Sequence, residues 1–91
     1  MVVRYACLCC GYLTLDEEPP GTYDICAVCN WEDDYLDLTN PADISQPKGG
    51  PNEMLSLRDA RENFAQFGAA SPDWSDRVRS PRDDERPRTL W

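Results

Sequence analysis

Two short stretches decide the fold of this chain: C-L-C-C at residues 7–10 and C-A-V-C at residues 26–29. Two residues between paired cysteines let both thiolates reach one ion, and two such turns form the closed tetrahedral sulfur site that structural zinc prefers. The gap of fifteen residues between the stretches matches the double pattern of zinc sites. The sequence therefore predicts one metal ion, zinc, held by Cys7, Cys10, Cys26 and Cys29.

The fifth cysteine, Cys9, lies inside the first stretch. Because Cys9 cannot pair with Cys7 or Cys10 around an ion through the same turn, we expect it to be a spare thiol. It is either a partly exposed side chain that tunes the site or a redox-sensitive thiol beside the metal. The alternative reading of the four paired cysteines is that they are reduced core residues without a metal. A disulfide framework is disfavoured, because the cysteine count is odd.

Chain length and composition explain why a metal is needed. A chain of 91 residues with eight prolines and five glycines is rich in loops, and its small core calls for a staple. We expect one cysteine-rich domain at residues 1–80 and a charged, extended tail at residues 81–91. Neither a secretory signal nor an apolar run of membrane-spanning length is visible, so the expected location is the cytoplasm, where thiols stay reduced.

Strand signals surround the cysteine stretches. Residues 2–6, 12–15 and 22–25 are rich in β-branched and aromatic side chains, and residues 16–21 form a polar turn. We expect residues 12–15 to pair with residues 22–25 in a hairpin that brings the cysteine stretches together at its open end. The predicted fold is a small α+β domain with a zinc-ribbon or rubredoxin-like hairpin and two CxxC metal turns.

One amphipathic helix is expected behind this hairpin, at residues 57–67. Ser56 and Asp59 are spaced for a capping box, and Gly68 supplies the left-handed residue that ends a helix. A shorter helix should begin at Pro72 and stop before residue 81. We expect the remaining segment, residues 82–91, to be extended, with its terminal Trp91 either docked or idle.

The positions of the aromatic side chains in the sequence predict a role for each of them. Phe64 and Phe67 lie on the apolar face of the helix and should pack into the core. Tyr12, Tyr23 and Trp31 should shield the metal's sulfurs from water. Trp74 either tethers the chain after the helix or makes an exposed contact.

Longer motifs resemble a known family. C-L-C-C-G-Y-L-T-L-D, I-C-A-V-C-N-W-E-D-D and S-L-R-D-A-R-E-N-F-A-Q-F-G-A, followed by V-R-S-P-R-D-D-E-R, are similar to the bacterial cysteine-rich CPCC family. The resemblance runs from Tyr5 to Glu85. Leu8 and Ala27 replace prolines and Asn30 replaces an aromatic residue, which makes the turns less rigid. The resemblance implies metal binding without an assigned catalytic activity, and an immunity role beside toxins for some members.

The charge and the lack of histidine argue against nucleic-acid binding and catalysis. Residues 1–76 carry four basic and fourteen acidic side chains, a net charge of −10, which repels phosphate backbones. The chain has no histidine, and a site closed by four cysteines has no open position for a substrate, so we do not expect an enzyme. The acidity either serves solubility alone or attracts a basic protein partner.

We therefore predict a zinc protein that binds another protein, in its most specific form an immunity protein that neutralises a basic toxin. The candidate contact residues are Glu32, Asp33, Asp34, Arg58, Arg61, Glu62 and Trp74. One alternative is a rubredoxin-like iron protein for electron transfer. The gap between the two cysteine pairs is much longer in rubredoxin than in this chain, which counts against this alternative. The other is a zinc ribbon that contacts nucleic acid through the arginines at positions 77, 79, 82, 86 and 88.

Overall fold

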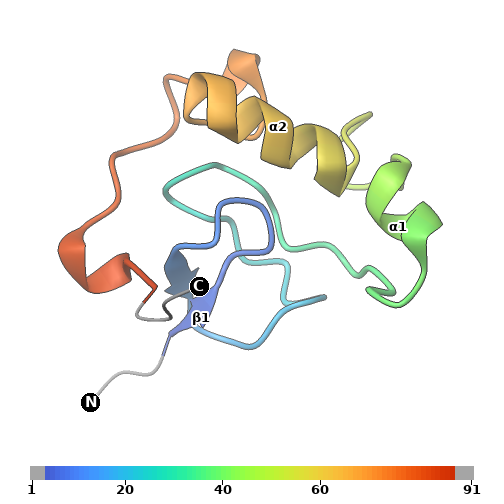
Figure 1. Cartoon of the computed structure of the whole chain (residues 1–91), viewed down its shortest axis with the longest axis horizontal. Helices are drawn as coiled ribbons and strands as arrows, with labels where there is room; N and C mark the ends of the chain where they lie inside the picture. Colours follow the sequence, from blue (N-terminus) through green and yellow to red (C-terminus); the bar gives the residue numbers. More distant parts are fainter. Residues whose placement is uncertain (1–3, 88–91) are drawn as a thin grey trace.

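The computed structural model describes residues 4–87 (Figure 1). The elements in chain order are β1 (Tyr5–Ala6), β2 (Leu13–Leu15), α1 (Pro41–Ser45), α2 (Leu57–Phe67) and the 3-10 turns η1 (Pro72–Trp74) and η2 (Asp83–Glu85). The two strands form an antiparallel hairpin, and α2 lies across the loops that carry the cysteines (Figure 1). This arrangement confirms a small α+β fold with a hairpin and an amphipathic helix.

The strand pairing differs from the prediction. β2 pairs with β1, with Tyr5 opposite Leu15 and Ala6 opposite Leu13. Residues 22–25 form no strand, and Ile25 makes only an isolated bridge to Glu32. The predicted pairing of residues 12–15 with residues 22–25 is therefore wrong. Each cysteine stretch is itself the turn of a hairpin, so the segment that enters it pairs with the segment that leaves it.

Helix α2 begins and ends where the sequence indicates. The Ser56 hydroxyl accepts a hydrogen bond from the Asp59 N–H at 3.0 Å, and the Asp59 carboxylate accepts one from the Ser56 N–H, which confirms the capping box. Gly68 ends the helix with a φ of 74°. Leu57 and Ala60 form the buried face of the helix.

The two phenylalanines of α2 have different surroundings. Phe64 is half-buried and meets the ring of Tyr12 edge to face, with 6.2 Å between the ring centroids. Phe67 is 50% exposed, so its assignment to the core is wrong. The reason is its place on the rim of an open groove, which also borders Val28 and Val78.

A short helix was missed between the cysteine stretches and α2. Helix α1 begins with Asn40, whose side chain accepts a hydrogen bond from the Ala42 N–H at 3.1 Å, and Pro41 occupies its first turn. Its five residues are too few to show a helical period in the sequence. The Asn-Pro pair was the one local signal of its start.

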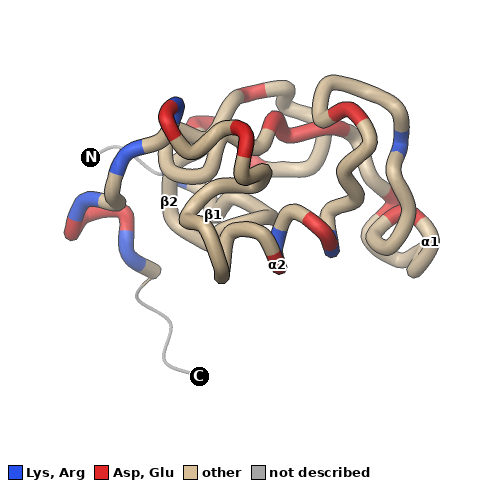
Figure 2. The backbone as a smooth tube through the Cα atoms, turned by 90° about the horizontal axis from the view of Figure 1, so that it is seen from above, with Lys and Arg blue, Asp and Glu red and all other residues tan. Residues whose placement is uncertain are grey.

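The chain after α2 is more tightly attached than predicted. The predicted helix at Pro72 is a single 3-10 turn, η1, which begins with the side chain of Ser71. Farther on, η2 interrupts the segment expected to be extended, and Glu85 within it is 1% exposed. Figure 2 shows the acidic residues of this segment flanked by basic residues on both sides. The prediction of an extended tail is wrong at residues 83–85, because neighbouring arginines compensate the buried Glu85 carboxylate.

The hydrophobic core lies between α2 and the cysteine stretches. Its buried members are Cys7, Cys9, Leu15, Cys26, Val28, Cys29, Trp31, Leu36, Leu57, Ala60, Ala69, Ala70 and Trp74. Within residues 4–87, no helix has the length and apolar character needed to cross a membrane. Predictions for residues 2 and 3, Arg88 and Trp91 fall outside the described residues.

Candidate metal centre

The first cysteine turn (residues 7–10) is closed by two backbone hydrogen bonds. The Gly11 N–H donates to the Cys7 carbonyl at 2.9 Å, and the Cys7 N–H donates to the Tyr12 carbonyl at 2.9 Å. Gly11 has a φ of 81°, a conformation that glycine adopts without a steric penalty. The chain therefore reverses within the turn and leads directly from β1 into β2.

The second cysteine turn (residues 26–29) has the same backbone pattern at the same offsets. The Asn30 N–H donates to the Cys26 carbonyl at 2.8 Å, and the Cys26 N–H donates to the Trp31 carbonyl at 2.9 Å. Asn30 has a φ of 67°, and asparagine tolerates this left-handed conformation better than most residues. Asn30 thus takes the place that Gly11 has in the first turn.

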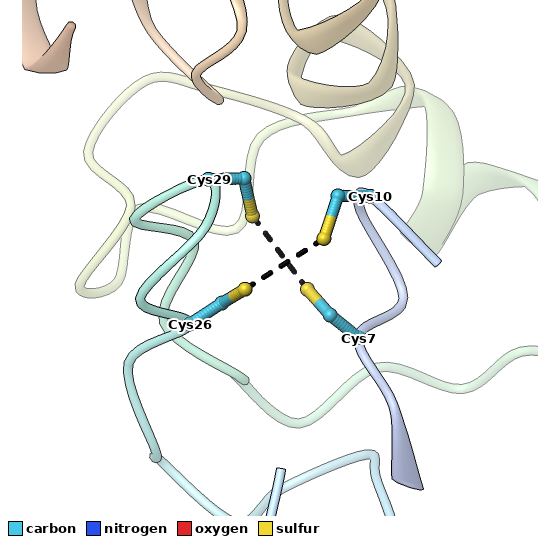
Figure 3. Close-up of side chains that lie close together, drawn as sticks. All are labelled: Cys7, Cys10, Cys26 and Cys29. Carbon is cyan, nitrogen blue, oxygen red and sulfur yellow. Dashed lines mark hydrogen bonds between the residues drawn. The ribbon is translucent and has the colours of Figure 1, made fainter. Parts of the chain in front are cut away.

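The two turns point their sulfur atoms at a common centre (Figure 3). The Sγ atoms of Cys7 and Cys29 are 3.6 Å apart, those of Cys10 and Cys26 are 3.7 Å apart, and all four lie within 4.8 Å of one another. A tetrahedron with metal–sulfur bonds of about 2.3 Å has edges of about 3.8 Å. The four side chains therefore fit one metal ion, and this donor set suits zinc or iron.

Burial separates this centre from water. Cys7 is 2% exposed, Cys26 and Cys29 are fully buried, and Cys10 is half-buried. Trp31 follows the second turn and is buried, as predicted, whereas Tyr23 is 55% exposed. The prediction that Tyr23 shields the sulfurs is therefore wrong.

Hydrogen bonds set the charge distribution among the sulfurs. The Cys10 thiol lowers the pKa of Cys26 most, and the Thr14 hydroxyl, 3.0 Å from the Cys26 Sγ, lowers it further. The same contact with Cys26 raises the pKa of Cys10. Hydrogen bonding by Cys10 lowers the pKa of Cys7 and raises that of Cys29. A metal ion bound by these four sulfurs would displace their protons.

Cys9 is not a member of this group of four sulfurs. It is 8% exposed, so the expectation of a partly exposed side chain is wrong. Its neighbours Cys7 and Cys10 both take part in the sulfur group. The structure therefore separates a set of four clustered cysteines from a single buried thiol, and the redox role of Cys9 stays a prediction.

Segments from the second half of the chain hold both turns at equivalent positions. The Arg61 side chain donates through Nε to the Leu8 carbonyl at 2.8 Å, and the Arg79 N–H donates to the Ala27 carbonyl at 3.2 Å. Leu8 and Ala27 each follow the first cysteine of their turn. The contribution of Thr14 to the centre and the anchoring by Arg79 were not predicted, because no local pattern brings these residues to the cysteines.

The predicted contact residues do not all lie at the surface. Arg58, Arg61 and Glu62 are exposed on α2, and Glu32 and Asp34 are half-buried. Asp33 and Trp74 are buried, so their assignment to a contact surface is wrong. The Asp33 carboxylate points inward because it accepts a hydrogen bond from the Thr22 N–H at 2.9 Å.

Comparison with protein families identifies the chain as similar to a known one. A family model described as Cysteine-rich CPCC covers residues 5–85, from β1 to the end of η2. No curated protein matches the chain. The matched range contains both cysteine turns, both helices and the arginines that anchor the turns.

Proposed function

The chain belongs to the cysteine-rich CPCC family, and from its cysteine centre we propose that it is a non-catalytic zinc protein that acts by binding another protein. One observation carries the metal part of this proposal. Four sulfurs from two equivalent turns lie at the mutual distances of a tetrahedral site, and three of the four residues are buried. Reduced cysteines that only fill a hydrophobic core do not require tetrahedral distances between their sulfur atoms.

The energetic role of the metal follows from the fold. The described sheet has only two strands, of two and three residues, and a two-stranded hairpin is at best marginally stable on its own. Structural zinc contributes on the order of 10 kcal/mol of folding free energy in small domains. The metal would therefore provide a large part of the stability of the N-terminal half.

The proposed absence of catalysis rests on the chemistry of the centre. Four thiolates fill the coordination sphere of zinc, so no position remains for water or a substrate. The chain has no histidine to serve as a general base. A zinc ion in this centre supports the fold and leaves function to the protein surface.

The interaction role is supported by the charge of that surface. The whole chain has a net charge of −8, and four thiolates around a divalent ion would add two further negative charges. Such a field speeds association with a basic protein. In its most specific form, the proposed partner is a basic toxin that this chain neutralises.

Metal analysis and two matched variants test the metal part. Protein purified under reducing conditions should contain one zinc ion per chain and be colourless. Cys10→Ser should lose the metal or bind it far more weakly, whereas Cys9→Ser should keep one equivalent. A red protein containing iron would instead indicate a rubredoxin-like centre.

Chelation gives the second readout. Removing the metal with a strong chelator and a reductant should abolish the near-ultraviolet circular dichroism of the buried Trp31, because the two cysteine turns separate. A metal-free protein with an unchanged spectrum and melting temperature would refute a structural role for the ion.

A further inference from the structure

Large hydrophobic side chains are exposed on the segment around the second cysteine turn. Tyr23 is 55% exposed, Ile25 is 59% exposed and Tyr35 is 62% exposed. All three lie in or beside the second hairpin (residues 22–33), in which Ile25 lies opposite Glu32. The ring of Tyr35 packs over Gly21, which brings it to the start of the segment that carries Tyr23 and Ile25. We call these three side chains the tyrosine face.

The backbone at Tyr23 gives an independent reason to single out this face. Tyr23 has a φ of 61°, a conformation that is rare for bulky residues and favours glycine or asparagine. The chain bulges there, because the Tyr23 N–H donates to the Asp33 carbonyl while the Asp33 N–H donates to the Asp24 carbonyl. An exposed tyrosine gains little from packing in this position. Folding stability alone therefore does not explain its presence.

The segment that carries the tyrosine face contains charged side chains of one sign. Residues 5–47 contain nine acidic side chains and no lysine or arginine. Figure 2 shows the basic residues near the chain termini, in α2 and at one place in the loop after α1. A partner that contacts this segment therefore meets acidic but no basic side chains from residues 5–47.

Asp33 is a buried carboxyl group in the same hairpin, and its backbone pairs with Tyr23 and Asp24. It is 1% exposed, and its Oδ1 atom has no hydrogen-bond partner among residues 4–87. Within that range, no lysine or arginine lies close enough to form an ion pair with it. A buried polar oxygen without a hydrogen-bond donor is costly, so Asp33 is a second feature of this hairpin that folding stability alone does not explain.

We propose that the tyrosine face is the docking surface for a basic segment of another protein, a proposal that rests on the interaction role inferred above. Tyrosines supply the large, rigid contact area typical of interface centres, and the acidic residues around them provide the charged rim. A second copy of this chain is disfavoured, because two such faces repel each other. Nucleic acids and anionic membranes are disfavoured by the same charge.

Selection from a random dodecapeptide display library, with the metal-loaded protein as bait, tests this proposal. Selected peptides should combine lysine or arginine with hydrophobic residues. Their affinity should fall at least about tenfold with Tyr35→Ser or Tyr23→Ser, the truncation cost of a central interface residue. Phe67→Ser and Met54→Ser are matched controls, because both side chains are exposed but lie outside the face, and they should leave affinity unchanged.

Different results would refute the tyrosine face and the proposed zinc protein. Selected peptides that lack basic residues, or that ignore both tyrosine substitutions, would overturn the tyrosine face even if the protein binds zinc and peptides elsewhere. Self-association that Tyr35→Ser abolishes would overturn it in favour of a dimer contact. Metal content and the near-ultraviolet spectrum of each variant report separately on the zinc centre, which the surface substitutions should leave intact.

Discussion

Replacing Glu85 with glutamine tests how the end of the described chain is held to the rest. Glu85 is 1% exposed and accepts two hydrogen bonds from the Arg79 guanidinium, at 2.8 and 2.6 Å. It also accepts a hydrogen bond from the Arg82 N–H at 2.8 Å, and the Arg4 guanidinium lies 3.6 Å away. Glu85→Gln keeps the shape of the side chain but removes the charge that these groups share.

The expected cost follows from the pKa of this carboxyl group. Arg79, with further help from Arg82, lowers the pKa of Glu85 from 4.5 to about 2. This difference corresponds to about 3 kcal/mol of stability at neutral pH. Because the Arg79 and Arg82 side chains are 38% and 59% exposed, solvent screens part of the interaction. We expect Glu85→Gln to lower the free energy of unfolding by about 2 kcal/mol and the melting temperature by about 10 °C.

Urea unfolding of the metal-loaded proteins, followed by tryptophan fluorescence, measures this cost. Asp84→Asn is the matched control, because its side chain is 72% exposed and its nearest pair with Arg82 spans 3.8 Å. The control should stay within about 0.5 kcal/mol of the parent. If Glu85→Gln were as stable as Asp84→Asn, the buried carboxylate would not hold this segment.

The pH dependence of the difference between parent and Glu85→Gln is a further check. Since folding lowers the pKa of Glu85, its contribution is fully present above about pH 5 and is lost as the pH falls from 4.5 toward 2. Loss of the metal in acid destabilises both proteins, so the difference between them is the quantity to measure. A difference that grew on acidification would contradict this sign.

Two further predictions concern the metal centre. Thr14→Val removes the hydroxyl donor 3.0 Å from the Cys26 sulfur and should weaken metal binding on the order of tenfold in competition with a chromophoric chelator, whereas Thr14→Ser should retain the parent affinity. Arg61→Ala removes the 2.8 Å hydrogen bond to the Leu8 carbonyl and should speed metal loss to the chelator several-fold, while Arg58→Ala, on the same helix, should not.

The candidate ligands were predictable because their pattern is local. The separation of Cys7 from Cys10, and of Cys26 from Cys29, determines which thiols one turn can present to an ion. The same is true of α2, whose start depends on Ser56 and its helical neighbours. Interactions between residues close in the sequence can be inferred without knowing how the rest of the chain folds.

The strand pairing was not predictable in this way. Residues 12–15 have a composition typical of strands. They could pair with residues 2–6 or with residues 22–25, and composition alone does not distinguish the two pairings. In the structure, each cysteine turn reverses the chain over a few residues, so β2 meets β1 before residues 22–25 are reached. The conformation of the turn decided the pairing.

The sequence by itself determined the four clustered cysteines, the bounds of α2 and the acidic character of the chain. Only the tertiary structure decided that Asp33 and Glu85 are buried while Tyr23 and Phe67 are exposed. The physical reason is that burial depends on what distant segments place around a side chain. Arg79, for example, both neutralises Glu85 and anchors the second cysteine turn through the Ala27 carbonyl, and neither contact can be inferred from residue types along the sequence.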